Sequence, residues 1–332
     1  MSDARLDVCG IGNAIVDVLS HEDDDFLTRH GMTKGTMALI DADQADKLYD
    51  DMGPGIECSG GSAANTIAGI ASLGGKAAFI GKVKDDQLGK VFRHDIKAIG
   101  VDFPTSPAED GLSTARCLIN VTPDAERTMN TFLGACVELG PSDVDEDVVR
   151  ASQVTYLEGY LWDKDNAKAA FVKAAELAHA AGREVSLSLS DPFCVDRHRD
   201  SFLELVENHV DILFANEDEI MSLYQTDTFD AALQYVRGHT SVAALTRGAK
   251  GSVVLQGDKL HISDAEPGVN VVDTTGAGDA YAAGFLFGYT DGGQNDLALC
   301  ARMGGIASAE IISHFGARPE VSLKDLVAEK IG

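Results

Sequence analysis

Apolar residues recur along this chain with two periods, one typical of strands and one typical of helices. Strand-like runs are expected at 8–18, 77–83, 154–159, 185–189, 211–215, 242–246 and 252–256. Helical spacing lies between most of them, at 62–73, 87–99, 167–181, 199–208 and 231–238. This alternation predicts an α/β fold, in which helices cover both faces of a central, mainly parallel sheet. Sheets of this kind bind ligands at the carboxyl ends of their strands.

Two stretches depart from the alternation. Residues 20–40 combine a charged run with a short apolar segment, and residues 111–133 have the pattern of two strands joined by a turn. Adjacent antiparallel strands inside an α/β chain predict a small, separate sheet. We therefore expect a β lid made of 20–40 and 111–133 over an α/β core made of 1–19, 41–110 and 134–332.

The most informative motif runs from Asp273 to Ala280, with the sequence Asp-Thr-Thr-Gly-Ala-Gly-Asp-Ala. It lies between an expected strand at 269–272 and an apolar helix pattern that begins near Tyr281. A loop of small residues that opens a helix presents unpaired backbone N–H groups and forms an anion site. Gly276 and Gly278 would let the backbone approach the anion closely.

Asp279 would then place a carboxylate in the first turn of this helix, where the helix dipole stabilises a negative charge. A base beside an anion site is what phosphoryl transfer to a hydroxyl group requires. The simpler interpretation is that Asp279 only caps its helix and that the glycines form a turn.

Composition narrows the classes of partner. Lys and Arg number 27 against 53 Asp and Glu, which gives the 332-residue chain a formal net charge of −26. This charge repels nucleic acid and anionic membranes, and neither is expected as a partner. It also repels ATP, so a nucleotide site would depend on metal ions and local backbone dipoles.

The cysteines and the N-terminus indicate the cellular compartment in which the protein is expected. The six cysteines include no Cys-x-x-Cys pair, which argues against a zinc site or a disulfide framework and suits a reducing environment. The N-terminus has no apolar signal region, and no apolar run reaches about 18 residues. We therefore expect a cytoplasmic protein.

Three common nucleotide-binding patterns are absent. Ile15 stands where a dinucleotide fingerprint beginning at Gly10 would need its third glycine. The chain has no Gly-x₄-Gly-Lys-Ser/Thr sequence, which excludes a P-loop, and no HRD and DFG set, which excludes the protein-kinase pattern.

Two motifs in the first quarter of the chain could bind a polyhydroxy ligand. In Gly60-Gly61-Ser62-Ala-Ala-Asn65, the glycine pair allows close approach and the Asn65 amide offers a donor and an acceptor. Alone, this pattern is more typical of a loop entering a helix with Ser62 as N-cap. In Gly12-Asn13-Ala-Ile-Val-Asp17, a carboxylate ends an apolar strand, where it could bind a vicinal diol, cap the strand or simply be solvated.

Taken together and in this order, these motifs resemble those of the ribokinase-like (PfkB) family of carbohydrate and nucleoside kinases. The resemblance implies that Asp279 is the general base and that the loop formed by Gly276, Ala277 and Gly278 binds the phosphoryl group being transferred. It also implies substrate contacts in the N-terminal part of the chain, from Asn13, Asp17, Gly60, Gly61, Ser62 and Asn65.

The resemblance extends to the nucleotide and its cations. Asn216-Glu217-Asp218-Glu219 is similar to the family's Asn-x-x-Glu motif, which implies that Asn216 and Glu219 help to hold Mg²⁺ and phosphates, mostly through water. An acidic helix start is also common for dipole reasons alone. The resemblance further implies ATP-binding and cation-binding residues. ATP contacts are expected from Asn216, Thr246, Arg247, Gly248 and Gly251, and a monovalent-cation site, for example for K⁺, from Asp273 and the backbone near Thr275 and Gly316.

Within the family, the sequence is more similar to adenosine kinases. Ser62 stands where ribokinases carry a lysine, and the spacing from Asn13 to Asp17 is longer than theirs. Arg127, Met129 and Tyr160 fall where that branch places its base-binding groups, although ordinary core or lid packing would also explain them.

We therefore predict an ATP-dependent kinase that phosphorylates a primary hydroxyl, the 5′-hydroxyl of adenosine or a similar nucleoside, as a monomer or homodimer. One alternative is a sugar kinase for fructose, ketodeoxygluconate or ribose. The other is a non-catalytic sensor that binds a nucleoside or sugar.

Overall fold

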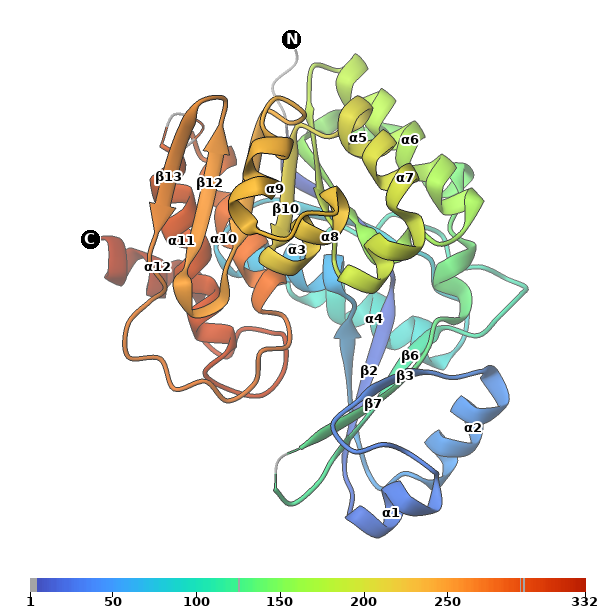
Figure 1. Ribbon diagram of the computed structural model, residues 1–332. Coiled ribbons are helices and arrows are strands. Elements are labelled where there is room, and N and C mark those ends of the chain that lie inside the picture. Colours follow the sequence, from blue (N-terminus) through green and yellow to red (C-terminus); the bar gives the residue numbers. More distant parts are fainter. Residues whose placement is uncertain (1–4, 125, 293, 295) are drawn as a thin grey trace.

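The computed structural model describes residues 5–124, 126–292, 294 and 296–332. An eight-stranded sheet with the order β13-β12-β11-β10-β9-β8-β1-β5 lies at the centre of the larger part of the molecule (Figure 1). Neighbouring strands from β5 to β11 pair in parallel, and β12 and β13 add an antiparallel edge. The strands are β1 (Leu6–Ile11), β5 (Ala77–Ile80), β8 (Ser152–Glu158), β9 (Glu184–Ser188), β10 (Ile212–Asn216), β11 (Val242–Thr246), β12 (Ser252–Gln256) and β13 (Lys259–Ser263). The α/β prediction is confirmed.

Helices cover both faces of this sheet, because successive side chains of a strand point to opposite faces. In β1, Cys9 and Ile11 pack into one apolar core and Val8 into the other. The first core is closed by α5 (Glu146–Ala151), α6 (Asp165–Ala180), α7 (Pro192–His209), α8 (Glu217–Tyr224) and α9 (Phe229–Val236). The second is closed by α3 (Ser62–Ser72), α4 (Gln87–Ala98), α10 (Ala277–Thr290) and α11 (Leu297–Ile311), with α12 (Leu323–Ile331) packed outside α11 and α3.

Short 3-10 helices complete the larger part. They lie at Gly134–Glu138, Pro141–Asp143, Gly159–Leu161 and Gly248–Lys250. Within the described residues, no helix combines the length and the apolar character that a membrane span needs.

A second, five-stranded sheet extends from the larger part, with the order β3-β7-β6-β2-β4 (Figure 1). Its strands are β2 (Ile15–His21), β3 (Met37–Leu39), β4 (Ile56–Gly60), β6 (Ala115–Val121) and β7 (Arg127–Phe132), and the helices between them are α1 (Asp24–Arg29) and α2 (Ala42–Asp51). The antiparallel pair of β6 and β7 confirms the two strands expected at 111–133. The sheet also contains β4, which lies outside the two ranges expected for the lid, and β2, of which only residues 20 and 21 lie inside them.

The single strand expected at 8–18 is wrong. The run divides into β1 in the large sheet and β2 in the small one, with a break at 12–14. A Cβ atom on Gly12 would collide with the carboxylate of Glu158, and the N–H of Asn13 donates to that carboxylate at 3.2 Å. The carboxylate of Glu158 therefore packs directly against this break.

The strand expected at 269–272 is also wrong. These residues form a loop in which Val272 N–H donates to Ile312 O at 2.8 Å and the side chain of Val271 is exposed. The helix that follows begins at Ala277, four residues earlier than its apolar pattern indicated.

Candidate active site

A cleft of about 1810 Å³ lies between the carboxyl ends of the large sheet and one face of the small sheet. The ends of β8, β9, β10 and β11 contribute Glu158, Ser188, Asn216 and Thr246 to its lining. A pocket for one small ligand typically measures about 300–1,000 Å³, so this cleft has room for two. Its position is the one that the sheet type predicts.

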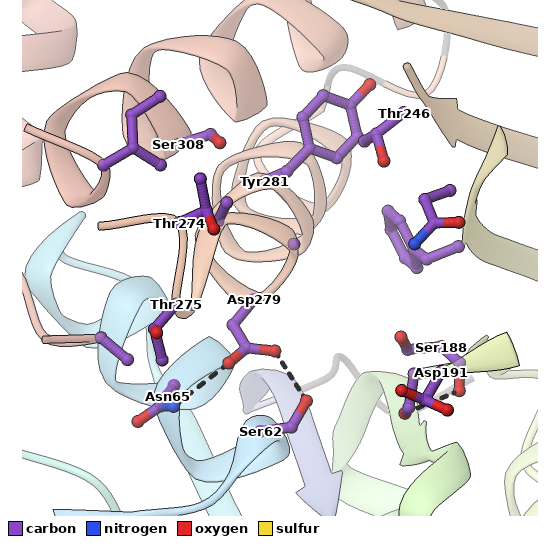
Figure 2. Close-up of a pocket in the computed structure, with 18 of the residues that line it drawn as sticks. Ser62, Asn65, Ser188, Asp191, Thr246, Thr274, Thr275, Asp279, Tyr281 and Ser308 are labelled. Atoms are coloured by element: carbon purple, nitrogen blue, oxygen red, sulfur yellow. Dashed lines mark hydrogen bonds between the residues drawn. The ribbon is translucent and has the colours of Figure 1, made fainter. Parts of the chain in front are cut away.

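Asp279 lies in the first turn of α10, as the sequence predicts. Its carboxylate accepts hydrogen bonds from Ser62 Oγ at 2.6 Å and Asn65 Nδ2 at 3.1 Å (Figure 2). Burial raises the pKa of Asp279 to about 6, although these two bonds and the nearby Arg318 oppose the shift. The group is therefore ionised at neutral pH and more basic than an exposed aspartate.

Two glycines precede Asp279, Gly276 and Gly278, and their surroundings differ. Gly276 has a φ of +78°, and a Cβ atom there would lie 2.6 Å from the Ala317 Cβ. A Cβ on Gly278 would meet no described atom within 4 Å, so this position borders open space. Of the three N–H groups expected to bind an anion, that of Ala277 donates to Thr274 O at 3.2 Å in this structure.

The glycine pair at 60–61 brings α3 close to the first strands. Gly61, with a φ of +97°, is the N-cap of α3, so the expectation that Ser62 caps this helix is wrong. Ser62 is the first helical residue, and its hydroxyl is free to reach Asp279. Cβ atoms on Gly60 and Gly61 would collide with the Asp17 carboxylate and the Asn13 carbonyl oxygen.

Asp17 lies within β2 rather than at the end of the first strand. It pairs in register with Cys58 of β4 and Cys117 of β6, and all three line the cleft. Burial raises the pKa of Asp17 to about 6, while Arg318 and Arg127 act in the opposite direction. No hydrogen bond to its carboxylate is present in the described part of the chain, which leaves both oxygens available to a ligand.

Asn13 lies at the floor of the cleft with its amide already engaged. Its Nδ2 donates to Glu158 Oε1 at 2.6 Å, and its Oδ1 accepts from Cys136 Sγ at 3.0 Å. The substrate contact expected of Asn13 would have to compete with both bonds.

The sequence analysis gave Glu158 no role, yet it organises this floor. It also accepts from Ala63 N at 2.8 Å, and burial raises its pKa to about 7. A carboxylate at the end of an apolar strand, the signal used for Asp17, could have identified it.

The three residues expected to contact the nucleobase, Arg127, Met129 and Tyr160, line the cleft in different ways. Arg127 forms an ion pair with Asp273, and both side chains are almost fully buried. Met129 faces the cleft from β7, and Tyr160 is 41% exposed. The sequence analysis missed the strongly exposed Phe193, which also lines the cleft and follows directly after Asp191-Pro192.

Asp273 is held by backbone N–H groups and by Arg127. The N–H of Thr275 donates to Oδ1 at 2.9 Å, and the N–H of Gly316 donates to Oδ2 at 3.1 Å. Thr275 and Gly316 thus present N–H groups, rather than carbonyls, to this carboxylate. Because Arg127 supplies a positive charge here, a monovalent cation would have to share Asp273 with a guanidinium.

Asn216 and Glu219 form a capping box at the start of α8. Asn216 donates to Glu219 from its backbone N at 2.9 Å and from Nδ2 at 2.7 Å. Glu219 is only 6% exposed, and burial raises its pKa to about 7. A cation on the cleft side would favour its ionised form, which fits a role beside Mg²⁺. The described residues contain no group of three His, Cys, Asp or Glu side chains arranged as a metal site, and Mg²⁺ typically uses few protein ligands.

The turn after β11 lies in the same cleft. Arg247 donates to Glu217 at 2.8 Å and lies over the ring of Phe229 at 4.1 Å from its centroid. Gly248 and Gly251 have φ values of +56° and +79°, and a Cβ on Gly251 would collide with a backbone oxygen of β13. With Thr246 at the strand end, these residues form a tight turn whose backbone faces the cleft.

Known proteins resemble this chain in both sequence and fold. It is 54% identical to adenosine kinase from Sinorhizobium meliloti, with a TM-score of 0.89 over 99% of this chain and 100% of that chain. It is 51% identical to a probable sugar kinase from Rhizobium etli CFN 42, with a TM-score of 0.90 over 98% and 99%. An uncharacterized sugar kinase from Archaeoglobus fulgidus is 28% identical over 254 residues, which are 75% of this chain and 96% of that protein. The model of the pfkB family carbohydrate kinases matches residues 57–323. The chain therefore belongs to the pfkB family of carbohydrate kinases.

Proposed function

We propose that this chain is an ATP-dependent kinase that phosphorylates the 5′-hydroxyl of adenosine or a closely similar nucleoside. Membership of the pfkB family makes it a phosphotransferase with an alcohol group as acceptor. One observation carries the finer proposal: two partly buried carboxylates, Asp17 and Asp279, line the same cleft, and apolar side chains continue the lining.

The reaction follows from the position of Asp279. A primary hydroxyl beside its carboxylate would give up its proton as the oxygen attacks the terminal phosphoryl group of ATP. Ser62 and Asn65 hold the carboxylate in place through their hydrogen bonds. N–H groups of Gly276, Ala277 and Gly278 would stabilise the charge on the transferring group. Mg²⁺ would offset the charge of the ATP phosphates, with Asn216 and Glu219 supporting it through water.

The apolar lining favours a nucleoside over a free sugar. We call Met37, Leu39, Ile56, Tyr160 and Phe193 the apolar wall, because all five line the cleft and are at least 41% exposed. Large apolar side chains left exposed in a pocket indicate a ligand that covers them. A nucleobase has a flat aromatic face of suitable size, whereas the C–H groups of a free sugar form a smaller apolar face interrupted by hydroxyls. The similarity to the Sinorhizobium meliloti adenosine kinase supports the same choice.

We also propose that the small sheet acts as a lid. Three residues of the apolar wall belong to it, so its movement toward the large sheet would bury them against a bound base. Closure of this kind excludes water that would otherwise accept the phosphoryl group.

A sugar kinase is the alternative within the family, supported by the similarity to the Rhizobium etli and Archaeoglobus fulgidus proteins. A non-catalytic sensor is disfavoured, because a binding protein has no need for a base at Asp279. The deciding experiment measures ATP consumption with a matched panel of nucleosides and free sugars. We expect adenosine to have the highest kcat/KM. A free sugar that exceeds every nucleoside would overturn the adenosine assignment.

The capping box gives a prediction about Mg²⁺. Glu219→Gln and Asn216→Ala should each raise the Mg²⁺ concentration for half-maximal rate by about 10-fold, since losing a group that supports a metal typically costs 10- to 100-fold. KM for the acceptor should change little. Asp230→Asn is the matched control, because Asp230 is an exposed acidic residue in the first turn of α9, outside the cleft. An unchanged Mg²⁺ dependence in both variants would mean that the box only caps α8.

A second prediction concerns K⁺. If a monovalent cation binds beside Asp273 and stabilises the loop before Asp279, the rate in a Tris-buffered assay should rise when KCl is added. The same concentration of tetramethylammonium chloride controls for ionic strength. Equal rates in the two salts would indicate that Arg127 alone neutralises Asp273.

A further inference from the structure

The cleft is lined by a cation that no motif predicted, the guanidinium of Arg318. This residue lies between α11 and α12, directly after Gly316-Ala317. Its Nη2 donates to Ser59 O at 2.7 Å and to Ser59 Oγ at 3.0 Å, and its Nε donates to Ser59 O at 3.2 Å. Ser59 is the penultimate residue of β4, so these bonds fix the guanidinium next to the Gly60-Gly61 pair.

The remaining nitrogen of Arg318 has no hydrogen-bond partner among the described residues. Nη1 is buried and makes no hydrogen bond to any described residue. Asn65 Oδ1 is likewise buried and accepts no hydrogen bond from a described residue, whereas Asn65 Nδ2 donates to Asp279. Buried polar atoms are normally paired, and an unpaired one is unfavourable. Two residues that line the cleft therefore carry an unsatisfied donor and an unsatisfied acceptor, and a hydroxyl group can serve either.

The surroundings of Arg318 indicate which hydroxyl it would meet. Gly60, which follows Ser59, packs so closely on Asp17 that a Cβ atom there would collide with the carboxylate. Arg318 also lies close enough to Asp17 and Asp279 to hold the pKa of each lower than burial alone would. A hydroxyl that donates its proton to Asp17 keeps lone pairs on its oxygen, which can accept from a neighbouring guanidinium.

We propose that Arg318 is a further specificity-determining residue, whose Nη1 donates a hydrogen bond to a ring hydroxyl of the acceptor held by Asp17. The inference rests on the proposed function only in requiring an acceptor with sugar hydroxyls, which nucleosides and free sugars share. A purely structural Arg318, which only ties β4 to the segment before α12, would affect every acceptor equally.

The test compares Arg318→Gln with wild type on the acceptor that wild type phosphorylates and on analogues that each lack one ring hydroxyl. For adenosine these are 2′-deoxyadenosine and 3′-deoxyadenosine. Arg318→Gln should lower kcat/KM for the complete acceptor by about 10-fold or more, the usual effect of losing a hydrogen bond to a charged group. It should lower kcat/KM much less for one of the two analogues, because that analogue already lacks the hydroxyl that Arg318 binds.

Two further variants keep the result decisive. Ser59→Ala removes a hydroxyl that contacts Arg318 but leaves Nη1, and the preference among the acceptors should stay that of wild type. Arg318→Lys retains the positive charge and replaces Arg318→Gln if thermal unfolding shows that the latter is unfolded. Equal losses on all acceptors, or a Ser59→Ala variant with the same selective loss, would overturn the proposal. If adenosine proves not to be the acceptor, the same comparison uses the deoxy analogues of the sugar that is.

Discussion

Asp279→Asn should lower kcat by about 10² or more and leave the dissociation constant of the acceptor nearly unchanged. The substitution keeps the size of the side chain but removes its negative charge and its ability to take a proton, and positioned general bases typically contribute about 10²–10⁴-fold. The dissociation constant is measured by calorimetry and kcat by ATP consumption. Because the base must be ionised, we also expect the wild-type kcat/KM to decline as the pH falls below about 6, the pKa to which burial raises Asp279.

The matched control is Asp291→Asn at the other end of the same helix. Asp291 is the exposed C-cap of α10, far from the cleft along the helix, and its loss should leave kcat near that of wild type. An Asp279→Asn enzyme that retained most of its kcat would exclude Asp279 as the base, even if the family assignment stood.

Wild-type enzyme should phosphorylate 2′-deoxyadenosine with a kcat/KM about 10³-fold or more below that for adenosine. The carboxylate of Asp17 is partly buried, its pKa is raised, and it makes no hydrogen bond to a described residue. A substrate without the hydroxyl would leave it unpaired, and sites built to bind a hydroxyl reject analogues lacking it by about 10⁴–10⁵-fold. A lost methylene, in comparison, costs about 10–200-fold.

Asp17→Ala should remove most of this preference while lowering kcat/KM for both nucleosides. Asp50→Ala is the control, since Asp50 is an exposed carboxylate of α2 in the same small part of the molecule. It should retain the full preference for adenosine. An Asp17→Ala enzyme that still preferred adenosine to 2′-deoxyadenosine as strongly as wild type would show that another residue binds the 2′-hydroxyl.

The helices and most strands could be predicted because their signals are local. The helix expected at 87–99 is observed at Gln87–Ala98, where an amphipathic pattern follows the N-cap Asp86. One strand was expected at 8–18, where the structure has two. The residues on both sides of the break are buried, so the hydrophobic pattern continues from one sheet into the other. The strand expected at 269–272 was wrong for a different reason. Its β-branched residues satisfy strand propensity, but no strand in the described part of the chain pairs with them.

In the candidate site too, features with local sequence signals could be predicted and those that depend on distant residues could not. The loop that carries Asp279 is recognisable because its glycines, its helix start and its base lie within a few residues of one another. Glu158 and Arg318 have partners far along the chain, at Asn13 and Ser59, which are separated from them by 145 and 259 residues. No single-sequence pattern encodes such contacts, since they arise only when the two sheets and the C-terminal segment have packed together.

The small sheet has a consequence for how the molecule folds. Its strand β2, which carries Asp17, pairs in parallel with the central strand β6, so that Ile15 lies opposite Ala115. During synthesis β2 can pair with β4 as soon as residue 60 has emerged, but it must wait for α3, β5 and α4 before β6 exists. Pairings between distant segments form slowly, because the loop between them must close before any contact compensates the lost entropy. The large sheet must wait longer still, because its β1 pairs with β8, with Leu6 opposite Ser152. The wall of the cleft that carries Asp17 is therefore expected to form before the larger sheet is complete.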